Sequence, residues 1–198
     1  MDGRFHHLTG TDVLTYTWII PPDGMIAVGE LAVITDGRTK TRYFARITGM
    51  KHDPDTSGLL VTGLPIGCIS LDGIFRKPRT IPPLRSPVRP LDAEEHAILR
   101  RFMGELEVGF MMSGNKKVED LPIGIPSSVL NQHLGVFATT GMGKSNLMKV
   151  FCASAISTRN AGILLTDPHG EYATGQPGDP DSRGLVHHPM AQEGLSVF

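Results

Sequence analysis

The sequence predicts an α+β chain in two parts, a small antiparallel β-barrel or sandwich followed by an incomplete α/β phosphate-loop domain with a parallel sheet. Short runs of β-branched and aromatic residues crowd the first 90 positions. A glycine-rich loop then separates an apolar run from a helix-like pattern within residues 134–150. A second apolar run at 163–166 completes the order strand, helix, strand, which predicts a parallel pair.

Composition excludes several broad classes of protein. The 198 residues carry a net charge of −1, so a nucleic acid partner would have to be held by a local basic patch. Cys68 and Cys152 follow no metal-ligand spacing, and Cys152 is expected to be a small buried thiol. Residues 1–7 do not form a signal peptide, and no apolar run is long enough to cross a membrane. We therefore expect a cytoplasmic protein that makes no membrane contact.

The first 90 residues predict several short strands bounded by turn residues. In chain order these are Val13–Ile20, Glu30–Thr35, Tyr43–Thr48, Gly58–Val61 and Cys68–Phe75, the last interrupted at Asp72-Gly73. Asp36-Gly37 predicts a hairpin between the second and third strands. Alternation places Leu14, Tyr16, Trp18 and Ile20 on one face of the first strand. On the third strand, Tyr43, Ala45 and Ile47 face one way, and Arg42, Phe44 and Arg46 face the other.

Residues 76–90 form a proline-rich and locally basic connector, which we expect to be neither a central strand nor a helix. Its cations are Arg76, Lys77, Arg79, Arg85 and Arg89. These cations either contact phosphates or an acidic partner, or they belong to an ordered, solvated linker.

A helix is predicted from an Asp92 cap, with Glu95 at its third position, to about Met103, and Gly104 is expected to end it. The expected division is a barrel at 1–90, a linking helix at 91–107 and the phosphate-loop domain at 108–198. Within that domain we expect a strand at Val108–Met112, a turn at Ser113–Asn115, a helix that runs to about Thr158 and stops at Asn160–Gly162, and a last strand from Leu195.

Residues 138–145, Ala-Thr-Thr-Gly-Met-Gly-Lys-Ser, form a phosphate-binding loop in the context that this motif requires, after a strand and before a helix. Gly141 and Gly143 permit backbone conformations that a Cβ would hinder, and the helix N-terminus adds partial positive charge. Lys144 is expected to reach the β- and γ-phosphates of ATP, and Ser145 to bind Mg²⁺. The expected nucleotide-binding residues are Thr139, Thr140, Gly141, Met142, Gly143, Lys144, Ser145 and Asn146. Ala138 replaces the usual first glycine, and the alternative is a turn that binds nothing.

Asp167 and Glu171 follow the second apolar run, at the sheet edge where open α/β sheets bind their ligands. Either carboxylate could order metal-bound water or polarise the attacking water, so both join Lys144 as candidate catalytic residues. Which of them is the general base stays open. The alternative is an ordinary turn at Asp-Pro-His-Gly, in which His169 either contacts phosphate or caps the turn.

Three segments, His133–Gly135, Ala138–Asn146 and Asp167–Tyr172, together resemble the HerA–FtsK group of ring-forming ATPases, HerA-like proteins in particular. The resemblance implies a RecA-like core, a small barrel before it, and a homo-hexamer that encloses double-stranded DNA and translocates it with ATP. It also implies a nuclease partner or, in bacterial defence systems, a sirtuin-like effector. The second acidic motif and the arginine finger of this group are expected beyond residue 198.

Two functions remain as expectations. The first is an ATP-hydrolysing subunit of a DNA translocase or helicase that works with a nuclease or defence effector, in DNA repair or anti-phage defence. The alternative is a nucleotide-gated oligomeric scaffold that organises an effector enzyme through its barrel. A small-molecule kinase is disfavoured because no arginine-rich lid follows the loop. About 90 residues cannot cover both faces of a doubly wound sheet, so we expect this chain to be part of a longer protein and, alone, to hydrolyse ATP poorly.

Overall fold

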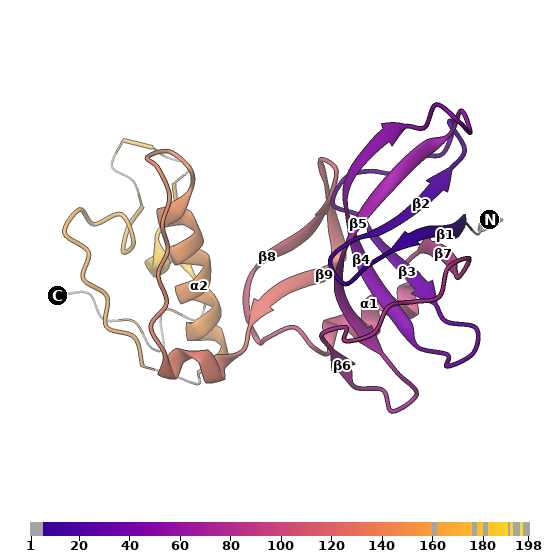
Figure 1. Cartoon of the computed structure of the whole chain (residues 1–198). Helices are drawn as coiled ribbons and strands as arrows, with labels where there is room; N and C mark the ends of the chain where they lie inside the picture. Colours follow the sequence, from indigo (N-terminus) through magenta and orange to yellow (C-terminus); the bar gives the residue numbers. More distant parts are fainter. Residues whose placement is uncertain are drawn as a thin grey trace. The chain divides into compact units, whose positions relative to one another are not determined.

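The chain forms two compact units in the computed structural model, which describes residues 6–159, 162–175, 178, 179, 182–189, 191 and 195 (Figure 1). The first unit comprises the residues up to Phe102 together with Met111–Leu121. The second comprises Met103–Phe110 and the residues from Pro122 onward. Among the described residues, no helix combines the length and apolar composition needed to span a bilayer.

Six strands of the first unit close into an antiparallel barrel. The sheet has seven strands, of which all but β6 belong to the ring: β1 (His6–Thr11), β2 (Tyr16–Ile20), β3 (Leu31–Thr35), β4 (Arg42–His52), β5 (Leu59–Ile69), β6 (Phe75–Arg76) and β7 (Pro87–Pro90). They follow the order β2-β1-β7-β3-β4-β5, and the pairing of β2 with β5 closes the ring while β6 pairs with β5 alone. The predicted antiparallel barrel is confirmed, and the sandwich is not formed.

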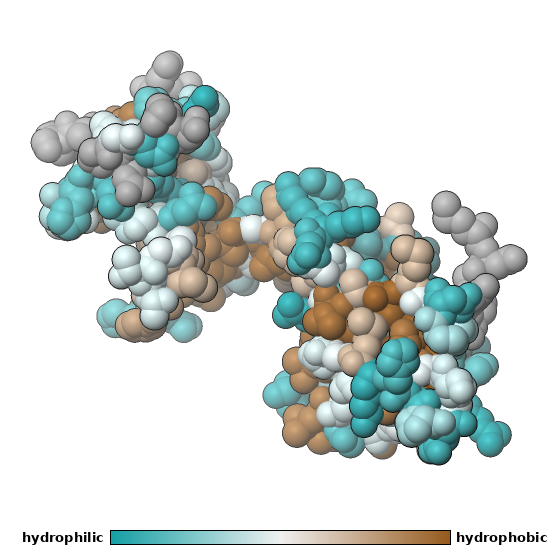
Figure 2. Space-filling view, turned by 90° about the horizontal axis from the view of Figure 1, so that it is seen from above, coloured by the Kyte–Doolittle hydropathy of each residue, from teal (hydrophilic) through white to brown (hydrophobic). Residues whose placement is uncertain are grey.

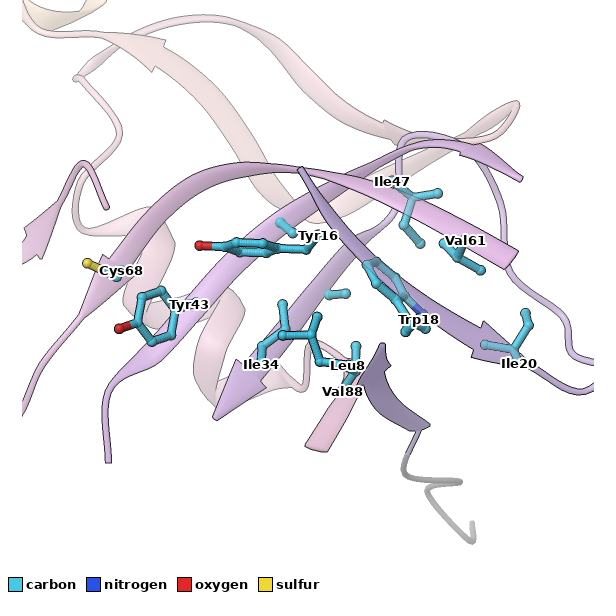
Figure 3. Close-up of a cluster of buried hydrophobic side chains, with 12 residues drawn as sticks. Leu8, Tyr16, Trp18, Ile20, Ile34, Tyr43, Ile47, Val61, Cys68 and Val88 are labelled. Carbon is cyan, nitrogen blue, oxygen red and sulfur yellow. The ribbon is translucent and has the colours of Figure 1, made fainter. Parts of the chain in front are cut away.

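The inner face of the barrel follows the predicted alternation at all but one position. Six predicted residues belong to the buried core, which Figure 3 shows in close-up: Tyr16, Trp18, Ile20, Tyr43, Ala45 and Ile47. The prediction for Leu14 is wrong, because this side chain is 70% exposed. The Asp12 carboxylate accepts hydrogen bonds from the backbone N–H groups of Leu14 and Thr15, so a turn occupies the position where the strand was expected to begin.

The prediction of two short strands at 58–61 and 68–75 is wrong, because β5 is one strand of 11 residues. Phe44 pairs with Gly67 and Ala45 with Pro65, so Ile66 forms a bulge. Gly67 is required there, since a Cβ would overlap the ring of Phe75. The glycines and the proline that suggested an interruption therefore serve a continuous, bulged strand.

The expectation that residues 76–90 hold no central strand is also wrong. β7 lies between β1 and β3 and completes the ring, with Val88 opposite both His6 and Ile34. Its two prolines, Pro87 and Pro90, stand at the ends of the strand. The backbone N–H donors therefore come from the residues between them, and the ladder tolerates both prolines.

The helix after the barrel, α1 (Ala93–Arg100), begins as predicted. The Asp92 side chain accepts from the Glu95 N–H, and the Glu95 side chain accepts from the Asp92 N–H, which is a capping box. The helix ends at Arg100 rather than near Met103, so Gly104 does not end it. Gly104 instead lies so close to the backbone of Ile125 that a Cβ would not fit.

Glu95 ties α1 to the barrel. Its side chain is 1% exposed, and its two carboxylate oxygens each accept a hydrogen bond of 2.7 Å from the Arg89 guanidinium on β7. Arg42 on β4 lies 3.9 Å from the same carboxylate. The hydrogen bonds with Glu95 raise the pKa of Arg89. Because a buried carboxylate depends on its cationic partners, this pair holds helix and strand together.

The hydroxyl of Tyr16 is buried and has no hydrogen-bond partner among the described residues. Its ring makes an edge-to-face contact with Tyr43, with 6.4 Å between the ring centroids, and burial raises the pKa of Tyr16. A buried hydroxyl without a partner costs about 1–3 kcal/mol. Tyr16→Phe is therefore expected to leave the free energy of unfolding unchanged or to raise it by about 1 kcal/mol, as measured by denaturant unfolding.

Tyr43→Phe is the matched control for Tyr16→Phe. The hydroxyls of Tyr43 and Thr80 hydrogen-bond at 2.8 Å, so this variant should lose about 1 kcal/mol of stability. A Tyr16→Phe protein less stable than the Tyr43→Phe protein would show that the Tyr16 hydroxyl has a partner after all.

In the described part of the second unit, the chain forms the hairpin ends, one long helix and two short 3-10 helices. These elements are β8 (Leu106–Ser113), β9 (Lys116–Ile125), η1 (Ser127–Asn131), α2 (Lys144–Thr158) and η2 (Leu185–His187). The strand at 108–112 and the helix end near Thr158 are confirmed, whereas Asn160, Ala161 and the residues after Leu195 lie outside the described chain. The hairpin tip belongs to the first unit, where Ser113 Oγ donates to Glu30 Oε1 at 2.7 Å.

The two strands expected on either side of α2 are not formed. Residues 133–139 and 162–167 are described, and neither segment is a strand. Phe137 is 93% exposed and Leu164 is 98% exposed, and hydrophobic surface is visible on this unit in Figure 2. A parallel strand needs paired neighbours and helices over both faces of its sheet, and the described residues supply neither. The expectation that these apolar segments stay uncovered in this chain agrees with their exposure.

Candidate nucleotide-binding site

The glycine-rich loop leads directly into α2, where the chain reverses direction (Figure 1). Gly141 has φ +84° and Gly143 has φ +81°, which is the left-handed region that favours glycine. A Cβ at either position would meet no atom within 4 Å, so the space beside the loop is open. Ala138 is not among the residues with positive φ, and alanine in place of the usual first glycine therefore causes no backbone strain here.

The first turn of α2 is suited to an anion. Gly143 precedes the helix without a side-chain cap, and no acidic residue lies in the first turn. The first N–H groups of a helix have no partner within it, and the helix dipole adds positive charge at the same end. Lys144 is exposed and brings a full positive charge to this point. Phosphate groups are the anions that such an arrangement commonly binds.

The predicted nucleotide-binding residues are accessible. Ser145 is half-buried, and the others are exposed: Thr139, Thr140, Gly141, Met142, Gly143, Lys144 and Asn146. Among the described residues, no group of three or more His, Cys, Asp and Glu side chains could hold a metal ion. Mg²⁺ usually takes one or two protein oxygens and completes its shell with phosphate oxygens and water. The Ser145 hydroxyl is the candidate protein ligand, and the metal would neutralise phosphate charge.

Asp167 stabilises its own turn. Its Oδ2 accepts hydrogen bonds from the backbone N–H groups of Tyr172 at 2.8 Å and Ala173 at 3.0 Å. Glu171 is half-buried and His169 is exposed in the same turn. Within residues 138–145, 167 and 171, all of them described, no hydrogen bond or ion pair joins the loop to either carboxylate. The turn that the sequence left as an alternative is present, and a role of these carboxylates in hydrolysis stays a prediction.

A segment that sequence reasoning missed holds this turn beside α2. The N–H of Leu185 in η2 donates to the carbonyl of Tyr172 at 2.8 Å, and Leu185 is buried. η2 contacts α2, whose Cys152 and Ala155 are buried. Burial raises the pKa of the Cys152 thiol, as expected for a small core residue. The glycine- and proline-rich sequence around η2 gave no periodic signal that could have revealed it.

A β-barrel followed by a glycine-rich loop that opens a helix is an arrangement compatible with a phosphate-loop protein that has an N-terminal barrel. Residues 106–197 match the family described as "Helicase HerA, central domain". By this similarity, residues 106–197 are assigned to a HerA-like central domain.

Three relatives named DNA double-strand break repair helicase HerA agree with this assignment. The proteins of Sulfolobus acidocaldarius and Sulfurisphaera tokodaii are each 32% identical over 102 residues, which is 52% of this chain and 19% of the relative. The protein of Saccharolobus solfataricus is 33% identical over 93 residues, which is 46% of this chain and 17% of the relative. The match therefore spans no more than 19% of the length of these relatives.

Proposed function

We propose that this chain is an ATP-binding and ATP-hydrolysing subunit of a DNA translocase or helicase. The observation that carries the proposal is the loop with two left-handed glycines at a helix N-terminus that has no side-chain cap and no acidic residue in its first turn. The family match and the names of the relatives, which are DNA repair helicases, support the reaction type.

In this proposal the backbone of residues 139–146 holds the phosphates of ATP. Lys144 balances charge on the β- and γ-phosphates, and the Ser145 hydroxyl ligates Mg²⁺. The parallel, RecA-like sheet belongs to the proposal as well. If residues 134–137 and 163–166 pair as parallel strands, the Asp167 turn and the glycine-rich loop both begin at the carboxyl edge of the sheet. Open α/β sheets bind their ligands at that edge.

The assembly and its partners are also part of the proposal. They follow the resemblance of the loop and the Asp167–Tyr172 run: a homo-hexamer, double-stranded DNA inside the ring, a nuclease or sirtuin-like effector, and a cytoplasmic role in DNA repair or anti-phage defence. The DNA repair role has the additional support of the relatives' names.

The scaffold remains the second candidate, and one observation favours it. A cavity of about 390 Å³ lies at the barrel, lined by Trp18, Ile20 and the fully exposed Met25 among others. Such a cavity is large enough to receive a side chain of an effector. In this alternative, ATP would stabilise the oligomer without being consumed.

ATP turnover by the full-length protein, measured with and without duplex DNA, separates the two candidates. The translocase requires Mg²⁺-dependent hydrolysis that rises when duplex is added. Saturable ATP binding with no turnover under either condition would favour the scaffold. If ATP neither binds nor is hydrolysed, both candidates fail.

The two carboxylates of the acidic turn predict different variant phenotypes. One carboxylate oxygen of Asp167 accepts two backbone hydrogen bonds, whereas among the described residues the Glu171 carboxylate accepts none. We therefore assign the role of general base to Glu171. Glu171→Gln should lower kcat about 10²-fold or more and leave the thermal midpoint unchanged. Asp167→Ala should lower stability by about 2 kcal/mol, because it removes two hydrogen bonds to a charged acceptor. Equal turnover in Glu171→Gln and wild type would exclude Glu171 as the base.

A further inference from the structure

One end of the barrel carries four exposed cations. We call it the basic end and define it by Arg38 and Lys40, in the β3–β4 turn, and by Lys77 and Arg79, which follow β6. All four residues are exposed. Among the described residues, none of their side chains forms a hydrogen bond or an ion pair.

The strand register brings the β3–β4 turn and the β5–β6 loop to the same end of the barrel, because Arg42 pairs with Ile69 and Ile69 pairs with Phe75, the first residue of β6. Tyr43, at the start of β4, pairs with Cys68, and Cys68 pairs with Arg76 on β6. Neighbouring strands lie about 4.8 Å apart, so the two loops leave the sheet about 10 Å from each other. The segment after β6, which carries Lys77 and Arg79, is held beside the start of β4 by the hydrogen bond between the hydroxyls of Tyr43 and Thr80. Figure 1 shows the β3–β4 turn and the β5–β6 loop at this common end.

Acidic residues at this end are already engaged. Asp72 pairs with Arg76 at 2.6 Å. Asp36 is buried and accepts hydrogen bonds from the Thr39 hydroxyl and from the backbone N–H groups of Arg38 and Thr39. These bonds, the one from the Thr39 hydroxyl first, hold the pKa of Asp36 below its usual value. Asp12, exposed in the β1–β2 turn, accepts hydrogen bonds from the backbone N–H groups of Leu14 and Thr15. The four cations therefore face solvent at an end where each of these carboxylates is bound to Arg76 or to donors of its own turn.

The opposite end of the barrel has the opposite charge. Asp23 lies in the β2–β3 loop, and Asp53 and Asp55 lie in the β4–β5 turn, with Lys51 as the nearby cation in the sequence. The near-zero net charge of the chain thus hides a charge asymmetry along the barrel. A polyanion would be attracted to one end and repelled from the other.

We propose that the basic end binds the sugar–phosphate backbone of duplex DNA, through Arg38, Lys40, Lys77 and Arg79, without reading its sequence. The choice of DNA as the polyanion rests on the proposed function. DNA presents closely spaced phosphates, so cations on two loops can each neutralise one and release its counterions. Leu71 and Ile74, exposed in the β5–β6 loop, are the features that an acidic protein partner would use instead.

The test is the salt dependence of DNA binding by the full-length protein. Each phosphate contact contributes about −0.9 to the slope of log K against log salt concentration, so a variant with Arg38, Lys40, Lys77 and Arg79 all replaced by Gln should have a slope shallower by about 3.6. Between 50 and 200 mM salt the wild type should lose on the order of 100-fold more affinity than this variant. The matched control replaces four other exposed cations by Gln, namely Arg46, Lys51, Arg100 and Lys116, and should keep the wild-type slope.

Failure of this inference is distinguishable from failure of the proposed function. If the variant that lacks the four cations keeps the wild-type salt slope, and DNA stimulates ATP turnover, then only the assignment of DNA binding to the basic end is overturned. If the four-cation variant has the shallower salt slope but the wild-type protein hydrolyses no ATP, the proposed function is overturned and the DNA-binding surface is supported. Wild-type protein that does not bind duplex would overturn the DNA assignment. So would a variant that loses binding to polyglutamate and keeps DNA binding, since the surface would then serve an acidic protein.

Discussion

Replacing Lys144 with alanine is expected to lower ATP turnover by the full-length protein at least 10²-fold. Lys144 is the first residue of α2, exposed, and placed directly after the left-handed Gly143. Removing one preorganised donor to developing charge typically costs about 10²–10³ in kcat. Alanine is also the residue that helices favour most, so the fold of α2 should survive the change. Steady-state ATP hydrolysis with saturating duplex and Mg²⁺ measures the effect.

Lys149→Ala is the control for Lys144→Ala. Lys149 lies on the same helix, away from its N-terminus, and the substitution removes the same charge and chain length. It should hydrolyse ATP at nearly the wild-type rate, and both variants should unfold at the wild-type temperature. An active Lys144→Ala protein would remove the main support for an ATPase of the phosphate-loop type.

Replacing Arg89 with alanine should destabilise the barrel by about 3–5 kcal/mol, because it leaves Glu95 buried without its counterion. Arg89 supplies both 2.7 Å hydrogen bonds to that carboxylate. Arg42, at 3.9 Å, is too distant to replace them. Part of the Arg89 side chain, 28%, stays exposed, so we expect the lower half of this range. Denaturant unfolding of the full-length protein, followed by tryptophan fluorescence of the core residue Trp18, measures the loss.

A double variant separates the ion pair from the packing around it. Arg89→Met together with Glu95→Leu replaces both charges with apolar side chains, and such exchanges are often neutral or stabilising. We expect the double variant to recover most of the loss. A double variant as unstable as Arg89→Ala would show that the aliphatic part of Arg89, and not the buried charge, accounts for the effect.

Strands of the barrel could be predicted from the sequence where buried and exposed side chains alternate. They could not be predicted where a strand forms only because neighbouring strands pair with it. Tyr16, Trp18 and Ile20 alternate with less buried neighbours, and their inner face followed directly. β7 has no such pattern, because a four-residue strand between two prolines is defined by its partners β1 and β3. The continuous β5 was missed for a related reason, since the bulge at Ile66 accommodates residues that locally favour a break.

The candidate site also has a part that local sequence predicts and a part that depends on contacts between distant residues. The loop at 138–145 is a local motif, and its positive φ angles at Gly141 and Gly143 agree with the conformations expected from the sequence. The acidic turn depends on longer contacts, and its bond to Leu185 could not be read from residues 167–172 alone. The basic end depends on tertiary contacts as well, because the segment that carries Lys77 and Arg79 is held beside β4 by the hydrogen bond between Thr80 and Tyr43.

The late position of β7 also constrains how the barrel is made during translation. The His7 ring hydrogen-bonds the carbonyl of Arg85, a sequence separation of 78 residues, and β1 pairs with the residues that follow. A nascent chain therefore presents one side of β1 as an open edge until β7 has left the ribosome, and open edges invite pairing with other chains. Such long-range closure slows folding. A chaperone that shields the first strands would be expected to raise the yield of folded barrel more than it raises the yield of α2.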